Sequence, residues 1–542
     1  MSYAQETRRR RTFAIISHPD AGKTTLTEKL LLFSGAIQIA GSVKARKASR
    51  HATSDWMEIE KQRGISVASS VMQMLYREHV VNLLDTPGHK DFSEDTYRVL
   101  TAVDSALMVI DAANGVESQT RRLIEVCRQR DTPIITFVNK MDREVRDPLD
   151  ILDEVERELG MPCVPMTWPV GQGKHFGGII NLRSQTMTVF ESGSERRPQD
   201  FETLPLSDTA TLKARFGSEW DAALESMELA TGASPTWDHE AFLAGKQTPV
   251  FFGSGVNNFG VMEVLDALVD LAPPPGPRKS SLVANKQTVE KIIQPDDEGF
   301  SGVVFKVQAN MDANHRDRIA FVRMASGKFT PGMKLKVQRT GKELRPTSVV
   351  TFMSQRREAV DEAYAGDIIG FTTHGGVQLG DTITDGASLQ FTGLPFFAPE
   401  LFMTVILKNP LRTKQLQTGL EQLGEEGAIQ VFKPEVGGPM LLGAVGQLQF
   451  EVVQHRLKAE YDCDVRLEGC QYTGARWITA DTPAELREFM NAYPQRLAKD
   501  AADTLAYLCT SPYDVRLAQE RFPKIHFHPL REHAGLALQS AG

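Results

Sequence analysis

The stretch Ser17-His18-Pro19-Asp20-Ala21-Gly22-Lys23-Thr24 decides the fold of the first half of the chain. It follows the apolar residues 13–16 and opens a segment of helical periodicity over residues 26–33. A tight loop between a strand and a helix, ending in Gly-Lys-Thr, is typical of a phosphate-binding P-loop. Its backbone N–H groups and the helix N-terminus bind the β-phosphate, Lys23 neutralises phosphate charge, and the Thr24 hydroxyl is a ligand for Mg²⁺. The first consensus glycine is a serine here, but the groups that the chemistry needs are present.

A second motif, Asp85-Thr86-Pro87-Gly88-His89, directly follows the apolar residues 80–84. A carboxylate at the carboxyl end of a buried strand lies where α/β sheets bind ligands, so Asp85 is predicted to hold Mg²⁺. Gly88 can offer its N–H to a γ-phosphate and can act as a hinge, because glycine tolerates unusual dihedral angles. Taken alone, Asp-Thr-Pro-Gly is an ordinary turn. The P-loop upstream favours a nucleotide-dependent switch.

His89 is the residue predicted to orient the attacking water, since phosphoryl transfer depends mostly on positioning and charge stabilisation. The alternative is a solvated loop histidine. Between the two motifs lies Arg63-Gly64-Ile65-Ser66, where the Ser66 hydroxyl is predicted to bind Mg²⁺ only when a γ-phosphate is present. The alternative for this stretch is a plain polar loop. No arginine finger is obvious apart from Arg63, and a site without one hydrolyses its nucleotide about 10³–10⁵-fold more slowly until a partner completes it.

A third motif, Asn139-Lys140-Met141-Asp142, follows the apolar residues 134–138 and is predicted to select the base. The Asp142 carboxylate can accept hydrogen bonds from N1–H and the exocyclic amine of guanine, a donor pair that adenine lacks. A site built on such a polar partner rejects the wrong analogue by roughly 10⁴–10⁵-fold. Asn139 is predicted to fix the loop and the base, and the stem of Lys140 is predicted to cover the ring. Gly253-Ser254-Gly255 is predicted to contact guanine O6 through backbone N–H groups.

The sequence therefore predicts binding of GTP/GDP and Mg²⁺, with His89 and Lys23 as catalytic residues. The predicted metal ligands are Thr24, Ser66 and Asp85. The predicted nucleotide-binding residues are Ser17, His18, Pro19, Asp20, Ala21, Gly22, Lys23, Thr24, Thr25, Asp85, Thr86, Pro87, Gly88, His89, Asn139, Lys140, Met141, Asp142, Ser254 and Gly255.

Outside the motifs, the pattern of the 542 residues predicts a multidomain α/β chain. Residues 1–278 alternate short apolar runs with amphipathic segments, which predicts a P-loop domain with a mostly parallel sheet and residues 67–76 as an antiparallel edge strand. A proline-rich linker at 272–277 interrupts this pattern. Residues 279–395 are strand-rich with glycine turns and predict a small antiparallel β-barrel. Residues 396–542 read β-α-β-β-α-β, the order of a ferredoxin-like α+β domain, and no sequence repeat is evident.

Composition narrows the class of protein. The net charge of −8 excludes wrapping of nucleic acid by bulk electrostatics, so any RNA contact needs a local basic patch. No apolar run reaches the roughly 18 residues that a membrane span needs. The five cysteines have no metal or redox spacing, which favours reduced thiols in the cytoplasm. The twin-arginine-like stretch Arg8–Arg11 lacks a following apolar region and is interpreted as a solvated basic lead-in to the first strand.

These motifs, followed by a barrel and a split α+β domain, resemble the translational GTPases. Flanking segments narrow the resemblance to the bacterial release factor 3 family. They are Ser54-Asp55-Trp56-Met57-Glu58, Ser69-Ser70-Val71-Met72-Gln73, Asp91-Phe92-Ser93-Glu94-Asp95-Thr96-Tyr97-Arg98 and Trp168-Pro169-Val170-Gly171. The resemblance implies a GTPase that binds the ribosome in termination and promotes dissociation and recycling of class I peptide chain release factors. It also implies large-subunit RNA as the activator and His89 as the water-orienting residue.

The expected form is a cytoplasmic monomer that needs neither membrane nor DNA. The first alternative is another translation factor GTPase of the elongation or translocase type, but the chain has no room for the further C-terminal domains of a translocase. The second is a GDP/GTP-gated ribosome-binding module whose hydrolysis is incidental. The third, an ATP-dependent P-loop kinase, is disfavoured by Asn139–Asp142. The C-terminal residues Arg521, Lys524, His526, His528, Arg531 and His533 could form an RNA-facing patch. The alternative is a half-buried strand with a solvated polar face.

Overall fold

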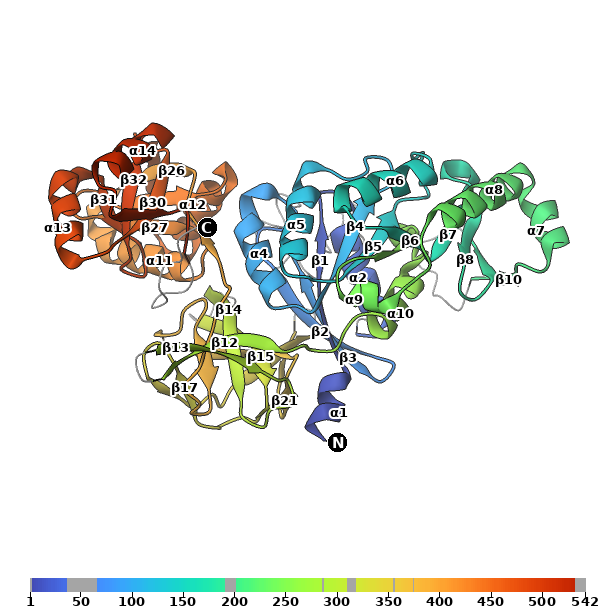
Figure 1. Cartoon of the computed structure of the whole chain (residues 1–542), viewed down its shortest axis with the longest axis horizontal. Helices are drawn as coiled ribbons and strands as arrows, with labels where there is room; N and C mark the ends of the chain where they lie inside the picture. Colours follow the sequence, from blue (N-terminus) through green and yellow to red (C-terminus); the bar gives the residue numbers. More distant parts are fainter. Residues whose placement is uncertain are drawn as a thin grey trace. The chain divides into compact units, whose positions relative to one another are not determined.

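The structure is a computed structural model that describes residues 2–36, 66–190, 201–284, 287–309, 318–353, 356–373 and 375–531 (Figure 1). The chain divides into two compact units. The first contains Met1–His89, Ala102–Gly276 and Thr351–Glu358. The second contains Lys90–Thr101, Pro277–Val350 and Ala359–Gly542.

The first unit is built on a seven-stranded sheet in the order β2-β3-β1-β4-β5-β11-β6. Its strands are β2 (Ser70–Tyr76), β3 (His79–Asp85), β1 (Arg10–Ser17), β4 (Ser105–Asp111), β5 (Ile134–Asn139), β11 (Thr248–Phe252) and β6 (Cys163–Pro165). All neighbours pair in parallel except β2, which pairs antiparallel with β3 at the sheet edge. The predicted mostly parallel sheet with an antiparallel edge strand is thus confirmed.

Continuous apolar runs form these strands because helices cover the sheet. Every residue of β4 is buried, as a strand covered on both faces requires. The main helices are α2 (Lys23–Phe33), α5 (Ser118–Gln129), α6 (Pro148–Leu159), α9 (His239–Leu243) and α10 (Val261–Asp270). Helix α2 packs against α10, and α5 packs against α6. The sheet shares one apolar core with α2, α9 and α10, and Phe13, Leu107 and Phe137 lie inside it.

An antiparallel insertion extends the first unit after β6. Its sheet has the order β10-β9-β8-β7, drawn in green to teal in Figure 1. The elements are β7 (Thr167–Val170), β8 (Gly178–Asn181), β9 (Thr186–Val189), β10 (Thr203–Pro205), α7 (Thr209–Phe216) and α8 (Ser218–Ala233). Helix α8 packs on β7, where Trp168 Nε1 donates a hydrogen bond to Ser226 Oγ at 3.0 Å.

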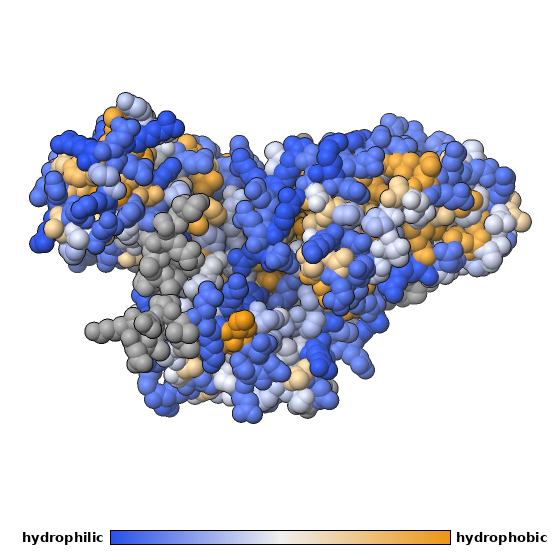
Figure 2. Space-filling view, viewed as in Figure 1, coloured by the Kyte–Doolittle hydropathy of each residue, from blue (hydrophilic) through white to orange (hydrophobic). Residues whose placement is uncertain are grey.

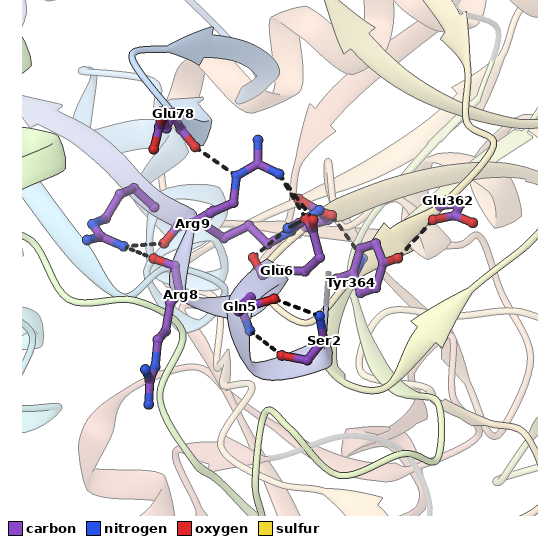
Figure 3. A network of polar contacts seen from close by, with 11 residues as sticks. Ser2, Gln5, Glu6, Arg8, Arg9, Glu78, Glu362 and Tyr364 are labelled. Atoms are coloured by element: carbon purple, nitrogen blue, oxygen red, sulfur yellow. Dashed lines mark hydrogen bonds and ion pairs between the residues drawn. The ribbon is translucent and has the colours of Figure 1, made fainter.

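The basic stretch Arg8–Arg11 leads into β1, which begins at Arg10, and part of it is paired rather than solvated. Helix α1 (Tyr3–Arg8) begins with a capping box between Ser2 and Gln5 (Figure 3). Arg10 is 5% exposed and forms an ion pair with Glu6 at 2.6 Å. Arg9 Nε donates to the carbonyl of Glu78 at 2.8 Å, so the stretch is tied to the β2–β3 turn. The interpretation as a solvated lead-in is wrong for Arg10, because neighbouring carboxylates and carbonyls compensate its burial.

The middle part of the chain contains an antiparallel sheet in the order β18-β17-β23-β14-β15-β22-β19-β20. These strands are β18 (Glu343–Leu344), β17 (Leu335–Val337), β23 (Thr382–Thr384), β14 (Ser301–Ala309), β15 (Arg318–Ser326), β22 (Ile368–Thr373), β19 (Val349–Met353) and β20 (Arg356–Ala359). Smaller sheets join β12 (Arg278–Ala284), β13 (Gln287–Ile293) and β24 (Gln390–Phe391), and pair β16 (Lys328–Phe329) with β21 (Ala363–Tyr364). This is the predicted small antiparallel β-barrel domain.

The C-terminal part contains the predicted β-α-β-β-α-β order twice. The first copy is β26 (Leu401–Leu407), α11 (Thr413–Glu425), β27 (Gln430–Pro434), β28 (Leu441–Ala444), α12 (Gln447–Tyr461) and β29 (Val465–Gly469). The second is β30 (Gly474–Ala480), α13 (Pro483–Ala492), β31 (Leu497–Lys499), β32 (Leu505–Cys509), α14 (Pro512–Arg521) and β33 (Ile525–His528). Pairing of β27 with β31 joins the copies into one sheet, β29-β26-β28-β27-β31-β32-β30-β33. The ferredoxin-like α+β prediction is confirmed, and the second copy extends it.

Helix α4 (Ser93–Thr101), which follows the Asp85–His89 motif in the chain, belongs to the second unit. Leu448 N, at the start of α12, donates to the Asp91 carboxylate at 2.8 Å. A Cβ on Gly446 would lie 2.0 Å from Asp91 Cγ, so only glycine fits there. Glu94 is buried beside Arg98 at 3.2 Å, and burial raises its pKa although the Arg98 guanidinium opposes the rise. Polar contacts therefore anchor α4 within this unit.

The C-terminal basic residues do not share one free face. Lys524 pairs with Glu485 at 2.6 Å, and His526 pairs with Asp481 at 2.9 Å. His528 is 2% exposed and shares a hydrogen bond of 2.8 Å with Thr479 Oγ1. His533 lies outside the described residues. The strand β33 thus fits the half-buried alternative better than an RNA-facing patch.

The visible face of the molecule is mostly hydrophilic, with scattered hydrophobic patches (Figure 2). Among the helices of the described residues, none has the length and hydropathy to cross a membrane. The five cysteines are free thiols, as predicted: Cys127, Cys163, Cys463, Cys470 and Cys509.

Candidate nucleotide-binding site

The predicted motifs meet at one edge of the first unit's sheet. Strands β1, β3 and β5 end at Ser17, Asp85 and Asn139, and because they run parallel their carboxyl ends face the same way. Register places Ile15 opposite Asp85. Loops from four places in the sequence therefore converge where α/β sheets bind ligands.

The P-loop, residues 18–22, has an unusual backbone. Asp20 and Gly22 have φ values of 65° and 97°, both in the left-handed region. A Cβ on Gly22 would lie 2.3 Å from Asn139 Nδ2, so glycine is required by both conformation and space. Helix α2 begins directly afterwards at Lys23, which aims its N-terminus and partial positive charge at the loop.

Asn139 joins three loops of the site. Its Nδ2 donates to the carbonyl of Ala21 at 2.8 Å, and its Oδ1 accepts from the Gly255 N–H at 2.8 Å. The side chain is 3% exposed, so these bonds form away from water and hold the loops firmly. Lys140 adds a second link to the P-loop, because its ammonium donates to the carbonyl of Asp20 and pairs with Asp111 at 2.6 Å.

Asp142 is held in place for base recognition. Ser254 Oγ donates to Asp142 Oδ1 at 2.6 Å, and Asn257 Nδ2 donates to Ser254 Oγ at 2.9 Å. Met141 N donates to the carbonyl of Gly253 at 3.1 Å, which ties the two loops together through their backbones. The carboxylate predicted to read guanine is therefore fixed by the loop predicted to contact guanine O6.

The phosphate side of the site contains a buried ion pair. Lys23 and Asp85 are 6% and 2% exposed, and the Lys23 ammonium contacts Asp85 Oδ1 directly. Asp85 Oδ2 is also buried and has no hydrogen-bond partner among the residues that the structure describes. An unpartnered carboxylate oxygen fits Mg²⁺, which prefers hard oxygen ligands. Thr24 and Ser66, the other two predicted ligands, are half-buried.

The Asp-Thr-Pro-Gly loop is fitted against the P-loop. Thr86 Oγ1 donates to the carbonyl of Ile15 at 2.7 Å. A Cβ on Gly88 would lie 3.3 Å from Pro19 N, so the two backbones approach closely. His89 follows and is half-buried. Residues 63–65, which include the candidate finger Arg63, lie outside the described residues.

Two carboxylates of the site were missed by sequence reasoning. Asp111 ends β4 opposite Asn139 of β5 and binds Lys140. The sequence could have indicated Asp111, because it is a polar residue that follows an apolar run, as Asp85 does. Glu117 contacts His18 of the P-loop, with Nε2 and Oε2 2.7 Å apart. No sequence pattern marks Glu117, since it lies in an ordinary loop before α5.

Comparisons with known proteins agree with this geometry. Residues 8–274 match the elongation factor Tu GTP binding domain, 299–386 match elongation factor G domain 2, and 391–519 match the class II release factor RF3 C-terminal domain. Peptide chain release factor 3 of Bordetella pertussis is 66% identical over 536 residues, covering 99% of each chain. The chain belongs to the peptide chain release factor 3 family.

Other relatives support the same assignment. Peptide chain release factor 3 of Nitrosomonas europaea is 64% identical over 544 residues and covers 100% of both chains. The crystal structure of ttk003000868 from Thermus thermophilus has a TM-score of 0.68 at 25% identity, covering 88% of this chain and 69% of that one. As a member of the peptide chain release factor 3 family, the chain is a translational GTPase of the termination phase, and its ligand is a guanine nucleotide.

Proposed function

We propose that this chain binds the ribosome during termination and uses GTP binding and ribosome-stimulated hydrolysis to promote dissociation and recycling of class I peptide chain release factors. The observation that carries the chemistry is the buried Lys23–Asp85 pair beside the P-loop, with one Asp85 oxygen left unpartnered by the described part of the chain. The name and close similarity of the full-length relatives support the role in termination.

Nucleotide binding follows from the two halves of the site. Backbone N–H groups of the P-loop and of the first turn of α2 bind the phosphates, while Asp142 accepts hydrogen bonds from the guanine edge. Asn139 keeps both halves at a fixed separation because it bonds to Ala21 and Gly255 at once. The site therefore binds the base and the phosphates of one nucleotide at the same time.

Hydrolysis is assigned to Lys23 and His89. The Lys23 ammonium stabilises charge on the β- and γ-phosphates, and His89 orients the attacking water from the loop after Asp85. Thr24, Ser66 and Asp85 would hold Mg²⁺, which when bound neutralises negative charge on the phosphate oxygens. Gly88 lies against the P-loop backbone, so a γ-phosphate beside it can change the shape of this loop.

The proposed role in termination also implies partners and a cellular location. The activator is the large-subunit RNA of the ribosome, and the proteins released are class I release factors. We infer a cytoplasmic monomer that needs neither membrane nor DNA. Residues 1–278, 279–395 and 396–542 act as nucleotide-binding, barrel and α+β domains.

One experiment tests the proposal. GTP hydrolysis is measured with and without purified ribosomes carrying a bound class I release factor, and dissociation of that factor is followed in the same reaction. We expect slow hydrolysis alone, strong stimulation by ribosomes, and loss of both stimulated hydrolysis and factor recycling in the His89→Ala variant. An unchanged rate with ribosomes contradicts the proposal. If His89→Ala stops turnover but still releases and recycles the factor, the chain is instead a GDP/GTP-gated binding module.

A further inference from the structure

The P-loop contacts a carboxylate that lies outside every motif of the sequence. Glu117 lies at the N-cap of α5 and pairs with His18, the first residue of the loop after β1. The two side chains are 30% and 31% exposed. A pair with this exposure contributes little to the free energy of unfolding, so its effect is expected elsewhere.

The first half of the P-loop needs support of its own. The left-handed φ of 65° at Asp20 is strained for a residue with a side chain and persists only when surrounding contacts hold it. Asn139 and Lys140 bind the carbonyls of Ala21 and Asp20, which fixes the second half. In the first half, the carbonyl of His18 accepts from Ser17 Oγ at 2.9 Å and from Ala21 N at 3.3 Å, and the only polar contact of its side chain within the described residues is the pair with Glu117.

The loop that presents Glu117 is itself fixed. Val116 N donates to Glu154 Oε1 at 3.3 Å, and Glu154 is paired with Arg146. Gly115 has a φ of 73°, and a Cβ there would lie 2.4 Å from Glu154 Oε2. The neighbouring Asp111 binds Lys140 of the base-recognition loop. Glu117 is thus a stationary anchor against which the P-loop can be held.

We propose that Glu117 is a positioning residue for nucleotide binding, which through His18 holds the first half of the P-loop with its backbone N–H groups presented to the phosphates. This rests on the proposed nucleotide site. Because the P-loop binds the phosphates that GDP and GTP share, losing the contact weakens both nucleotides alike. Glu117 does not reach the base, so guanine specificity stays unchanged.

The test measures affinity and dissociation rate for fluorescent mant-GDP and mant-GTP by stopped flow, with Glu117→Ala, Glu117→Gln and Arg121→Ala. For Glu117→Ala we expect both affinities to fall about three- to tenfold, as for loss of one hydrogen bond, mostly through faster dissociation. Glu117→Gln keeps an acceptor oxygen for the His18 Nε2–H group and recovers most of the loss. Arg121→Ala removes another α5 ion pair, the 2.6 Å contact with Glu158, and stays at wild-type affinity.

Two further readouts separate positioning from structure. In ribosome-stimulated hydrolysis, Glu117→Ala raises KM for GTP while kcat changes little, and its melting temperature stays near that of Arg121→Ala. His18→Ala combined with Glu117→Ala weakens binding no more than either change alone. The inference is overturned if Glu117→Ala binds mant-GDP like the wild type, or if Glu117→Gln loses as much affinity as Glu117→Ala. Lys23→Ala and Asp142→Asn run in parallel, since undiminished mant-GDP binding by both variants would refute the proposed nucleotide site itself, whatever the result for Glu117.

Discussion

The base corner and the phosphate side of the site differ in how complete they are. At the base corner, Ser254 Oγ donates a hydrogen bond to Asp142 at 2.6 Å, and Asn139 bonds to both Gly255 and Ala21 at 2.8 Å. On the phosphate side, Lys23 is paired with Asp85, whose second oxygen finds no partner within the described ranges. We infer that specificity for guanine is built into the folded chain, whereas the proposed groups for hydrolysis are rearranged by nucleotide, Mg²⁺ and an external activator.

The difference suits a switch. A preorganised base corner costs little on binding, so nucleotide can be held firmly in both states. An incomplete phosphate side keeps hydrolysis slow until a partner arrives. Changing single residues on each side should therefore have distinct effects, and the following predictions test that division.

The largest expected effect comes from breaking the base corner with Asp142→Asn. The amide replaces one acceptor oxygen by a donor, so the site should lose guanine and prefer xanthine, which carries a carbonyl in place of the amine. We expect the guanine-over-xanthine preference to change by about 10⁴-fold, the discrimination that a buried polar partner can supply. Competition between GDP and XDP for the purified chain measures it. Asp150→Asn on α6, an exposed residue, is the matched control, and unaltered GDP affinity in Asp142→Asn would refute the base assignment.

This corner was also the most predictable part of the molecule. Asn139 at this corner, like Asp85 on the phosphate side, could be placed from sequence because long apolar runs mark the strands and a polar residue directly follows each run. The partners of these residues could not be placed in the same way. Glu117 reaches His18 only because the fold brings two loops together, and no local pattern encodes that contact.

The fold shows the same limit. The first β-α-β-β-α-β copy was predictable because α11 buries a regular stripe of Leu416, Leu420 and Leu423. The second copy was missed because β31 has three residues and the only fully buried residue of α14 is Ala518. Its sheet is completed by pairing with β27, a tertiary effect that outweighs weak local signals.

The phosphate side is tested next by Lys23→Ala. Turnover at saturating GTP should fall by on the order of 10²–10³, as when one charge-stabilising group is removed from a transition state. Asp85 then stays buried without its cation, which should also lower the free energy of unfolding by about 3–5 kcal/mol. Single-turnover hydrolysis on ribosomes and denaturant unfolding measure the two effects.

A second substitution separates these two losses. In Lys23→Ala/Asp85→Asn, the buried charge is gone, so stability should recover in part while hydrolysis stays low. Lys174→Ala, an exposed lysine of the same unit, should behave like the wild type. Wild-type turnover in Lys23→Ala would remove this lysine from the site, and an unchanged unfolding midpoint would show that the pair with Asp85 carries no stability.

Removal of Mg²⁺ should have an intermediate effect confined to the phosphate side. Asp85 Oδ2 has no hydrogen-bond partner among the described residues, so chelation removes the cation proposed to bind there and leaves the phosphate charge to be neutralised by Lys23 without Mg²⁺. We expect nucleotide dissociation to accelerate by at least tenfold, the factor of about 1.4 kcal/mol, with no change in the guanine-over-xanthine preference. Dissociation of mant-GDP with and without EDTA tests both parts. A change in base preference would show that the two sides are not separate.

The smallest expected effect is that of Ser254→Ala, which removes one support of the base corner while keeping Asp142 itself. The hydroxyl donates to Asp142 Oδ1 at 2.6 Å and accepts from Asn257 at 2.9 Å. Without it the carboxylate can turn away from the guanine edge, and GDP affinity should fall about threefold to tenfold, in keeping with loss of one hydrogen bond to a charged group. GTP and GDP should be affected equally, and ribosome-stimulated kcat should stay near the wild-type value. If kcat falls instead, the base corner participates in activation, and the division between a preformed recognition side and an incomplete catalytic side does not hold.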